Sequence, residues 1–426
     1  MENITGVILA PTADQPLILV NIIGLAFSLY STVSTLFKKS TTPPGTSVVK
    51  IQMGLSTSHE QEPGADGPGG HIPSVVLYNE FGSKFGKKLN KQHRTATEGE
   101  DVSVWVRHKH EGDSYPHYLS LFQPLKERLE ERKRPGQEDF HIGGVDPVCI
   151  SAIWLAGPDS EIYGWTGDIG ASCGAQWYYS NAIVGIDGFQ PPCVWLGRNS
   201  RRGGFRHGGM SMQITGFQTT PQRQAWVKEN PKVLCDSPAR FSMYTYLNEH
   251  HSIPTFGPEF NYYDDEARNG IDNREGRLPL SVDWQLYKDS RHLPLMGARD
   301  TTLVMDLGSG MGRSNIQRDL EHLEHSEELR NQFRALHETF SNSLVTSRNP
   351  SHSARTLCES ASSVGPDFVS LSEGLFCDMS QKIILPVCNE FSKSDCFDRE
   401  SNTTRGSEIG NFLTKRESPY IKFRDW

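Results

Sequence analysis

The chain has 426 residues, with 43 Lys and Arg against 51 Asp and Glu, and its formal net charge is −8 at neutral pH. This balance leaves no domain-wide basic surface, so the composition excludes a general nucleic-acid binder. Gly and Pro are frequent enough to indicate a turn-rich chain, and they stay below the level typical of wholesale disorder. The length favours two or three domains.

An apolar segment and a linker occupy residues 1–45. No charged side chain lies between Gln15 and Phe37, and residues 17–37 are just long enough to cross a hydrocarbon core of about 30 Å as a helix. We expect a single-pass signal-anchor or transmembrane helix, with a cleaved leader and a buried core helix as alternatives. Lys38 and Lys39 favour a cytosolic main body by the positive-inside rule, whereas the cysteines favour a body outside.

Residues 46–220 are predicted to form an antiparallel β-sandwich. Apolar residues alternate in several short runs that are separated by Gly and Pro turns, which is typical of sandwich strands. The predicted strands are residues 47–55, 72–78, 102–107, 148–155 and 210–217.

The remaining chain is divided by composition. We predict a loop-rich connection over 221–300, in which the chain is loop-like from Phe241 to Gly276, and a polar helical segment over 301–345. A cysteine-rich region follows over 346–400, and a polar tail over 401–426. The expected fold class is therefore mainly β, with a polar helix and a cysteine-rich C-terminal region, or α+β overall.

The eight cysteines fall into two groups of four. Such grouping predicts two local sets of disulfides, each with three possible connectivities, and an oxidising compartment. Eight free thiols in a cytosolic protein are the alternative. The sequon at Asn402 is a glycosylation site if the polar tail is lumenal. The cysteines are Cys149, Cys173, Cys193, Cys235, Cys358, Cys377, Cys388 and Cys396.

One dense stretch, from Trp165 to Trp195, combines large aromatic residues, two cysteines and several glycines. We expect a tightly turned, cross-linked β core there, with Trp195 packed beside Cys193. Exposed aromatic rings would also suit a sugar-stacking platform, which makes a carbohydrate-binding module an alternative function. The candidate stacking residues are Trp165, Trp177, Tyr178 and Tyr179. On a strand, Trp177 and Tyr179 would share one face.

A glycine motif from Asp306 to Gly312 resembles the nucleotide-binding turn of S-adenosylmethionine-dependent methyltransferases. That fold requires a second apolar strand and an acidic residue about twenty positions later. The next thirty residues are instead a polar helical pattern, so a loop leading into a helix is the preferred interpretation. No other cofactor site and no metal site is predicted: the pair His322 and His325 and the acidic residues 264–272 miss the usual ligand spacings.

Several motifs together resemble an uncharacterised family of filamentous-fungal proteins, many of them predicted to be secreted. These are Gly164-Trp-Thr-Gly-Asp, Cys173-Gly-Ala-Gln-Trp-Tyr-Tyr-Ser-Asn and Pro192-Cys-Val-Trp, with Leu357-Cys-Glu-Ser, Gly365-Pro-Asp-Phe-Val, Phe376-Cys-Asp-Met and Cys396-Phe-Asp. The resemblance covers residues 46–400 in patches and implies a shared fold and a secretory origin, but no activity. Relatives carry an acidic segment after Pro-Cys-x-Trp, whereas this chain has Gly197-Arg-Asn-Ser-Arg-Arg, which removes a cation-binding role for that loop.

The sequence thus favours a non-enzymatic protein, secreted or anchored at the cell surface, with an interaction or structural role. No catalytic set of residues stands out. The expected partners are a cell-surface glycan or protein, and the membrane through residues 17–37.

Overall fold

The computed structural model describes residues 43–56, 67–109, 115–123, 146–158, 162–184, 188–197, 205, 207–217, 235, 238–256, 294–295, 340–390, 392–405 and 420–426. Within these residues, strands greatly outnumber helices, and most strands pair in antiparallel fashion. The predicted mainly β, α+β class is confirmed.

The first six-stranded sheet is antiparallel and has the order β10-β11-β8-β1-β6, with β9 also paired to β8. Along β6, side chains are alternately exposed and buried, so Val102, Val104 and Val106 face the interior as the sequence pattern predicts. The strands are β1 (Thr46–Met53), β6 (Asp101–Arg107), β8 (Val148–Ala156), β9 (Ile162–Thr166), β10 (Trp177–Tyr178) and β11 (Cys193–Leu196).

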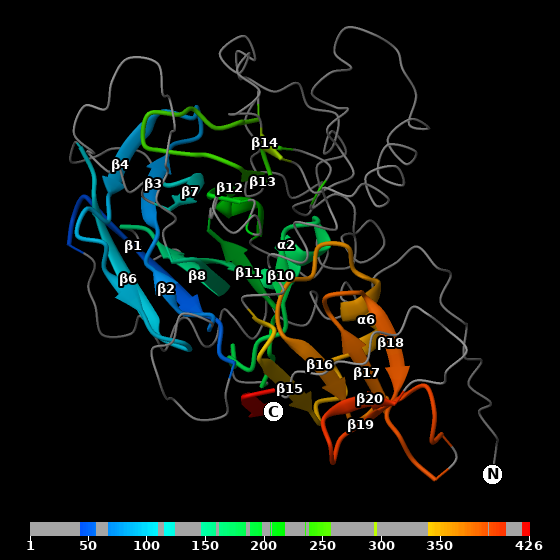
Figure 1. Ribbon diagram of the computed structural model, residues 1–426. Coiled ribbons are helices and arrows are strands. Elements are labelled where there is room, and N and C mark those ends of the chain that lie inside the picture. Colours follow the sequence, from blue (N-terminus) through cyan, green and yellow to red (C-terminus); the bar gives the residue numbers. More distant parts are fainter. Residues whose placement is uncertain are drawn as a thin grey trace, which may run out of the picture.

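The second six-stranded sheet packs face to face with the first (Figure 1) and has the order β14-β13-β12-β7-β3-β4. One buried core draws side chains from both sheets, including Ile51 of β1, Leu77 of β3 and Met212 of β12, so the two sheets form a sandwich. The strands are β3 (Ser74–Tyr78), β4 (Lys84–Lys88), β7 (Tyr118–Phe122), β12 (Gly209–Gln213), β13 (Phe241–Tyr244) and β14 (Pro294–Leu295).

Two further contacts close the sandwich at its margins. An isolated antiparallel bridge between Gly86 and His108 joins β4 to the residues that follow β6. The short strands β2 (Gly70–His71) and β5 (Thr95–Ala96) pair with each other.

Three local expectations from the sequence were wrong. Phe241–Tyr244, at the start of the stretch expected to be loop-like, form β13, which pairs with β12 and places Phe241 and Met243 in the core. The predicted strand 210–217 stops at Gln213 and continues as the 3-10 helix η2 (Ile214–Phe217). The dense aromatic stretch is not all β, since it contains the helix α2 (Gly167–Ser172).

The close packing of α2 explains the glycine in its middle. A Cβ atom at Gly170 would lie 2.6 Å from Val194 Cγ2 and 3.0 Å from Trp165 Cζ2. Only a residue without a side chain lets α2 approach β9 and β11 this closely.

The C-terminal region builds a third sheet of order β18-β17-β16-β15-β21 (gold to red in Figure 1). β15 runs parallel to both β16 and β21, and the helix α6 (Ala354–Glu359) connects β15 to β16. Ser353 caps α6, because its Oγ accepts a hydrogen bond of 3.0 Å from the amide of Thr356. The strands are β15 (Ser343–Ser347), β16 (Asp367–Ser370), β17 (Leu375–Asp378), β18 (Ile383–Pro386) and β21 (Lys422–Asp425).

A hairpin of β19 (Cys396–Asp398) and β20 (Thr403–Arg405) covers the outer face of this C-terminal sheet. Phe397 of the hairpin stacks on Phe376 of β17 with ring centroids 4.0 Å apart. The stretch expected to be a polar tail, 401–426, therefore supplies two strands, β20 and β21.

In the part of the chain that the structure describes, no helix combines the length and the apolar character needed to cross a bilayer. The segment 17–37, for which a spanning helix is predicted, lies outside the described residues.

Candidate functional site

Four disulfides pair all eight cysteines: Cys149–Cys193, Cys173–Cys235, Cys358–Cys377 and Cys388–Cys396. Each bond stays within one of the two sequence groups, which confirms two local sets. The sequence left three connectivities open in each group, and the structure selects one. Four disulfides in one chain indicate an oxidising, extracellular-type environment.

The dense stretch forms a junction between the sandwich and the C-terminal sheet. Trp177, Tyr178 and Tyr179 share one buried cluster with side chains of the C-terminal region, and we call this cluster the junction. Its C-terminal members are Val345, Ala354, Leu357, Cys358, Phe368, Cys377 and Met379, with Leu375, Ile384 and Trp426 packed against them.

Hydrogen bonds tie four aromatic side chains of the dense stretch to the C-terminal region. Trp177 Nε1 donates to Ser360 Oγ at 3.0 Å, and Tyr178 OH donates to the Pro366 carbonyl at 2.9 Å. Tyr179 OH accepts from the amide of Ser353 at 3.0 Å, and Trp195 Nε1 donates to the Val364 carbonyl at 2.8 Å. Since these side chains are buried, each bond satisfies a polar atom that would otherwise be costly to desolvate.

The four candidate stacking residues are all interior. Trp165, Trp177, Tyr178 and Tyr179 are between 0% and 5% exposed. Trp165 stacks on Phe241 with centroids 5.7 Å apart, while Trp177 and Tyr179 meet edge to face at 5.3 Å. None of the four presents a ring face to solvent. Trp195 is also buried, in a cluster with Cys193, as the sequence predicts.

A buried histidine completes the junction. The ring of His352 stacks on Tyr179 at 4.7 Å and meets Trp426 edge to face at 5.2 Å. Its Nδ1 lies 3.0 Å from Ser347 Oγ. Burial lowers the pKa of His352 to about 4, so the ring is neutral near pH 7.

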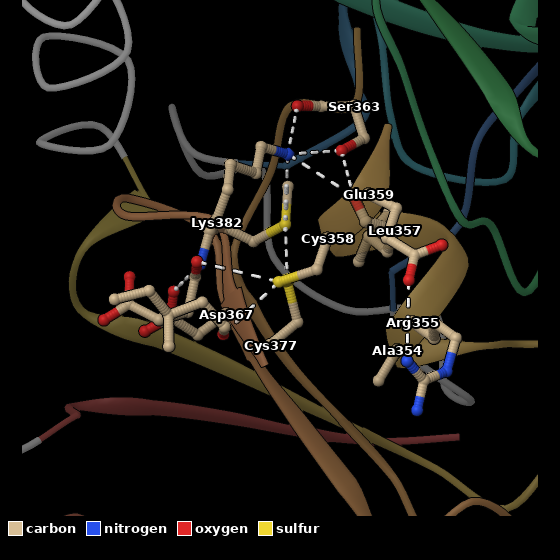
Figure 2. Close-up of a disulfide and its surroundings, with 12 residues drawn as sticks. Ala354, Arg355, Leu357, Cys358, Glu359, Ser363, Asp367, Cys377 and Lys382 are labelled. Carbon is tan, nitrogen blue, oxygen red and sulfur yellow. Dashed lines mark hydrogen bonds and ion pairs between the residues drawn. A yellow bond between two sulfur atoms is a disulfide. The ribbon is translucent and has the colours of Figure 1, made fainter. Parts of the chain in front are cut away.

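A lysine lies beside the Cys358–Cys377 disulfide (Figure 2). The ammonium of Lys382 contacts the Ser363 hydroxyl, the Ser363 carbonyl at 2.9 Å and the Leu357 carbonyl at 3.4 Å. It therefore ties the last turn of α6 to the loop that leads into β16. The carbonyl groups of a last helical turn lack partners within the helix, and the ammonium supplies one. Burial lowers the pKa of Lys382 to about 7.

A serine and a lysine of near-neutral pKa are the two groups that Ser-Lys hydrolases use. Here Ser363 is 1% exposed, and its hydroxyl lies within hydrogen-bonding distance of the Leu357 and Ser360 carbonyls. The Ser363 hydroxyl donates to backbone carbonyls, the Lys382 ammonium donates to backbone carbonyls and to that hydroxyl, and the serine is closed to solvent. The arrangement acts as a structural tie rather than as a nucleophile presented to a substrate.

A buried carboxylate lies in the first turn of α2. Asp168 is 1% exposed, and neither of its carboxylate oxygens has a hydrogen-bond partner of good geometry. Burial raises the pKa of Asp168 to about 6, and the nearby Thr166 hydroxyl and the backbone amides of the first turn only partly offset this. Ionisation of this side chain therefore costs folding free energy.

Nothing local in the sequence singles out Asp168, His352 or Lys382. Asp168 belongs to a family-like motif whose spacing gives no reason for burial. The positions of the His352 and Lys382 side chains depend on contacts with residues that are distant in the chain or in a neighbouring loop. Only the burial observed in the fold distinguishes them from surface residues.

The other sequence candidates are placed as follows. Asn402 lies in the turn between β19 and β20 and is partly exposed. The glycine motif 306–312, the His322 and His325 pair, and the acidic residues 264–272 lie outside the described residues. Among the described residues, no three His, Cys, Asp or Glu side chains gather in a way that would hold a metal ion.

No family model matches the chain, and no curated protein is similar to it. Two solved structures of lipoxygenase (LOX) variants show a distant likeness. One is 8% identical over 35% of this chain and 16% of its own, with a TM-score of 0.18. The other is 9% identical over 48% of this chain and 21% of its own, with a TM-score of 0.20. The chain spans no more than about a fifth of those proteins, and a likeness at this level supports no conclusion on fold or function.

Proposed function

We propose that the protein is a non-enzymatic, disulfide-stabilised protein of the secretory route, secreted or held at the cell surface with its main body outside. The supporting observation is the pairing of all eight cysteines in four disulfides. Disulfides persist in oxidising compartments, and reducing systems remove them from cytosolic proteins. The resemblance of the motifs to often-secreted fungal proteins agrees with this location.

The role proposed for the protein is interaction or structural support. Its densest aromatic stretch packs between the sandwich and the C-terminal sheet and joins them. This favours one rigid body that presents surfaces to partners. A membrane anchor through residues 17–37 would fix this body at the surface of a cell.

The compartment is tested in cells on the full chain. We expect non-reducing peptide mapping to recover the four disulfides, and Asn402 to carry a glycan that peptide N-glycosidase removes. Asn402→Gln is the matched control for the glycan, because it keeps the amide group and abolishes the sequon. Recovery of eight free thiols from intact cells would contradict the proposal.

Two alternatives stay open to direct tests. A carbohydrate-binding module that uses Trp165, Trp177, Tyr178 and Tyr179 requires exposed rings, and the burial of all four weighs against it. A glycan array with no binder, or unchanged binding in a folded Trp177→Ala variant, would remove that alternative. A methyltransferase built on Asp306–Gly312 predicts that S-adenosylmethionine at 100 times its Kd adds about 2.7 kcal/mol to stability. An unmoved melting temperature would argue against it.

A further inference from the structure

Basic side chains gather along one margin of the sandwich, although the chain as a whole is acidic. Residues 79–94 comprise the turn between β3 and β4, β4 itself and the loop that follows it. They carry five Lys and Arg residues against one acidic residue, Glu80. Arg107, at the end of β6, and Lys109 add to this charge. We call Lys84, Lys87, Lys88, Arg107 and Lys109 the basic edge.

Backbone pairing brings the two halves of the basic edge together. The bridge between Gly86 and His108 joins the segments, and the amide of Lys109 donates to the Phe85 carbonyl at 2.8 Å. Lys87, Lys88 and Lys109 are exposed. None of these three forms an ion pair with any residue that the structure describes. The cluster is therefore assembled by the fold, from segments about twenty residues apart.

The positive charges of this cluster act on one another. The pKa of Lys84 is lowered, first by burial and then by the nearby charges of Lys109 and Lys87, while Glu249 opposes the shift. Lysines on an edge strand also discourage strand pairing between molecules. That explanation does not extend to Lys109, which lies on the segment already bridged to β4. A bound polyanion would relieve the mutual repulsion.

An exposed aromatic ring stands at the end of the basic edge. Phe81 is 74% exposed at the tip of the turn between β3 and β4. The turn is firmly held: Asn79 Oδ1 accepts hydrogen bonds from the amides of Phe81 at 3.1 Å and Ser83 at 2.9 Å. Gly82 adopts a φ of 74°, which favours glycine, and it lies close to the side chain of Thr255. The ring is thus displayed by a braced turn rather than by a loose loop.

We propose that the basic edge and Phe81 form a binding site for an acidic polysaccharide. Sulfate or carboxylate groups would lie along β4, and a sugar ring would pack on Phe81. Lys84, whose ammonium also donates to the Glu249 carbonyl at 2.9 Å, and Lys88 lie at the two ends of β4. Because the pairing of β3 and β4 shifts register at Leu77 and Tyr78, they lie at most about 13 Å apart at 3.3 Å per strand residue, a spacing that suits a linear polymer better than a single anion. The charged side chains follow a single margin of the sandwich, which favours a linear polysaccharide over the extended plane of a membrane surface.

This site names a partner for the interaction role proposed above and rests on that role. The test uses the full, oxidised chain and fluorescein-labelled heparin as the probe. Lys87→Gln, Lys88→Gln and Lys109→Gln are combined in one variant. A control variant combines Arg355→Gln, Lys393→Gln and Arg399→Gln, which are exposed residues of the C-terminal region, so both variants lose the same charge.

We expect the basic-edge variant to raise the Kd for heparin by about tenfold or more and to flatten its salt dependence, because fewer counterions are released. The control variant should bind like the natural chain. Phe81→Ala should weaken binding most clearly at high salt, where ring packing is not screened but charge is.

Equal losses in the two variants would overturn the proposal, as would tighter binding to phosphatidylserine vesicles or to duplex DNA than to heparin. No binding to heparin would also overturn it. Non-reducing peptide mapping of the same preparation distinguishes failure of this site from failure of the proposed location. Intact disulfides without heparin binding refute the site, whereas free thiols refute the location.

Discussion

Two buried ionisable residues, Asp168 and His352, give the stability of the fold opposite dependences on pH. Asp168 has its pKa raised to about 6, and His352 has its pKa lowered to about 4, in both cases chiefly by burial. The native state therefore prefers a protonated carboxyl at one position and an unprotonated ring at the other. Both preferences fall in the weakly acidic range, where they act against each other.

For Asp168→Asn we expect a gain in stability that grows with pH. The native pKa lies above the unfolded value of 3.8, so the contribution of Asp168 is fully present below pH 3.8 and is lost as pH rises through 6. Between pH 4 and pH 7 the variant should gain about 2 kcal/mol relative to the natural chain. Urea unfolding at several pH values measures this. Glu400→Gln, which changes an exposed carboxylate, is the control, and a pH-independent difference would refute the assignment.

His352→Gln should show the reverse trend. The native pKa of His352 lies below its unfolded value of 6.5, so its contribution is fully present above pH 6.5 and is lost as pH falls toward 4. The variant should therefore resist acid better, gaining about 3 kcal/mol relative to the natural chain between pH 7 and pH 4. Acid titration followed by tryptophan fluorescence is suitable, because Trp426 contacts the ring. His250→Gln, whose ring is exposed, should leave the acid transition in place.

Among the structural elements, the disulfides differ in the length of chain that they close. Cys149–Cys193 spans 44 residues and Cys388–Cys396 spans 8. Loop-closure entropy alone predicts stabilisation of about 4 kcal/mol for the first and about 2.5 kcal/mol for the second.

We therefore expect the double variant Cys149→Ala and Cys193→Ala to lose more stability than Cys388→Ala and Cys396→Ala. Guanidinium unfolding of both variants checks the order. Burial of the first pair should widen the difference, because two truncated side chains leave a cavity in the core. A larger loss at Cys388 and Cys396 would show that loop length does not control the stabilisation.

The long strands were predictable because their residues alternate between core and solvent or form short apolar runs. β6 shows the alternation plainly, and β8 is the apolar run expected at 148–155. α2 was not predictable: six residues with two glycines carry no helical period, and contacts with Val194 and Trp165 fix the turn. β13 was missed although Phe241 and Met243 alternate with Ser242, because the run has only four residues and its pairing with β12 appears only in the fold.

At the scale of the whole molecule, the junction makes the sandwich and the C-terminal sheet one body. Besides the aromatic cluster, Trp426 Nε1 donates to the Ser56 carbonyl, and Arg424 pairs with Glu98 at 3.9 Å. These contacts link residues far apart in the sequence. We expect a single cooperative unfolding transition for the intact protein.

Gly365→Ala should loosen the junction. A Cβ atom at Gly365 would lie 2.3–2.6 Å from ring carbons of Tyr178, whose hydroxyl is itself held by the Pro366 carbonyl. Overpacking of this kind costs about 1–3 kcal/mol. Calorimetry should show the C-terminal sheet melting ahead of the sandwich. In a Tyr178→Leu background the same substitution should cost less, and an equal cost would refute the proposed clash.

The sequence indicated the importance of Trp165–Trp195 but not its role. Composition identified a packed, cross-linked core, and the burial of Trp195 beside Cys193 agrees with that. It gave no means of knowing that Trp177 and Tyr179 pack against residues about 170–180 positions later, since such pairing depends on the tertiary fold alone. The basic edge was missed for a similar reason, because its two segments meet only through the bridge at Gly86 and His108.

The two sides of the junction lie far apart in the sequence, and this separation has a consequence for synthesis on the ribosome. Tyr179 is made 174 residues before its partner Ser353, a delay of roughly 10–35 s at 5–20 residues per second. During this delay the aromatic face of the nascent sandwich is uncovered and available to chaperones. The first four cysteines, ending at Cys235, all emerge before Cys358, so their two bonds can close before any cysteine of the second group is available to mispair.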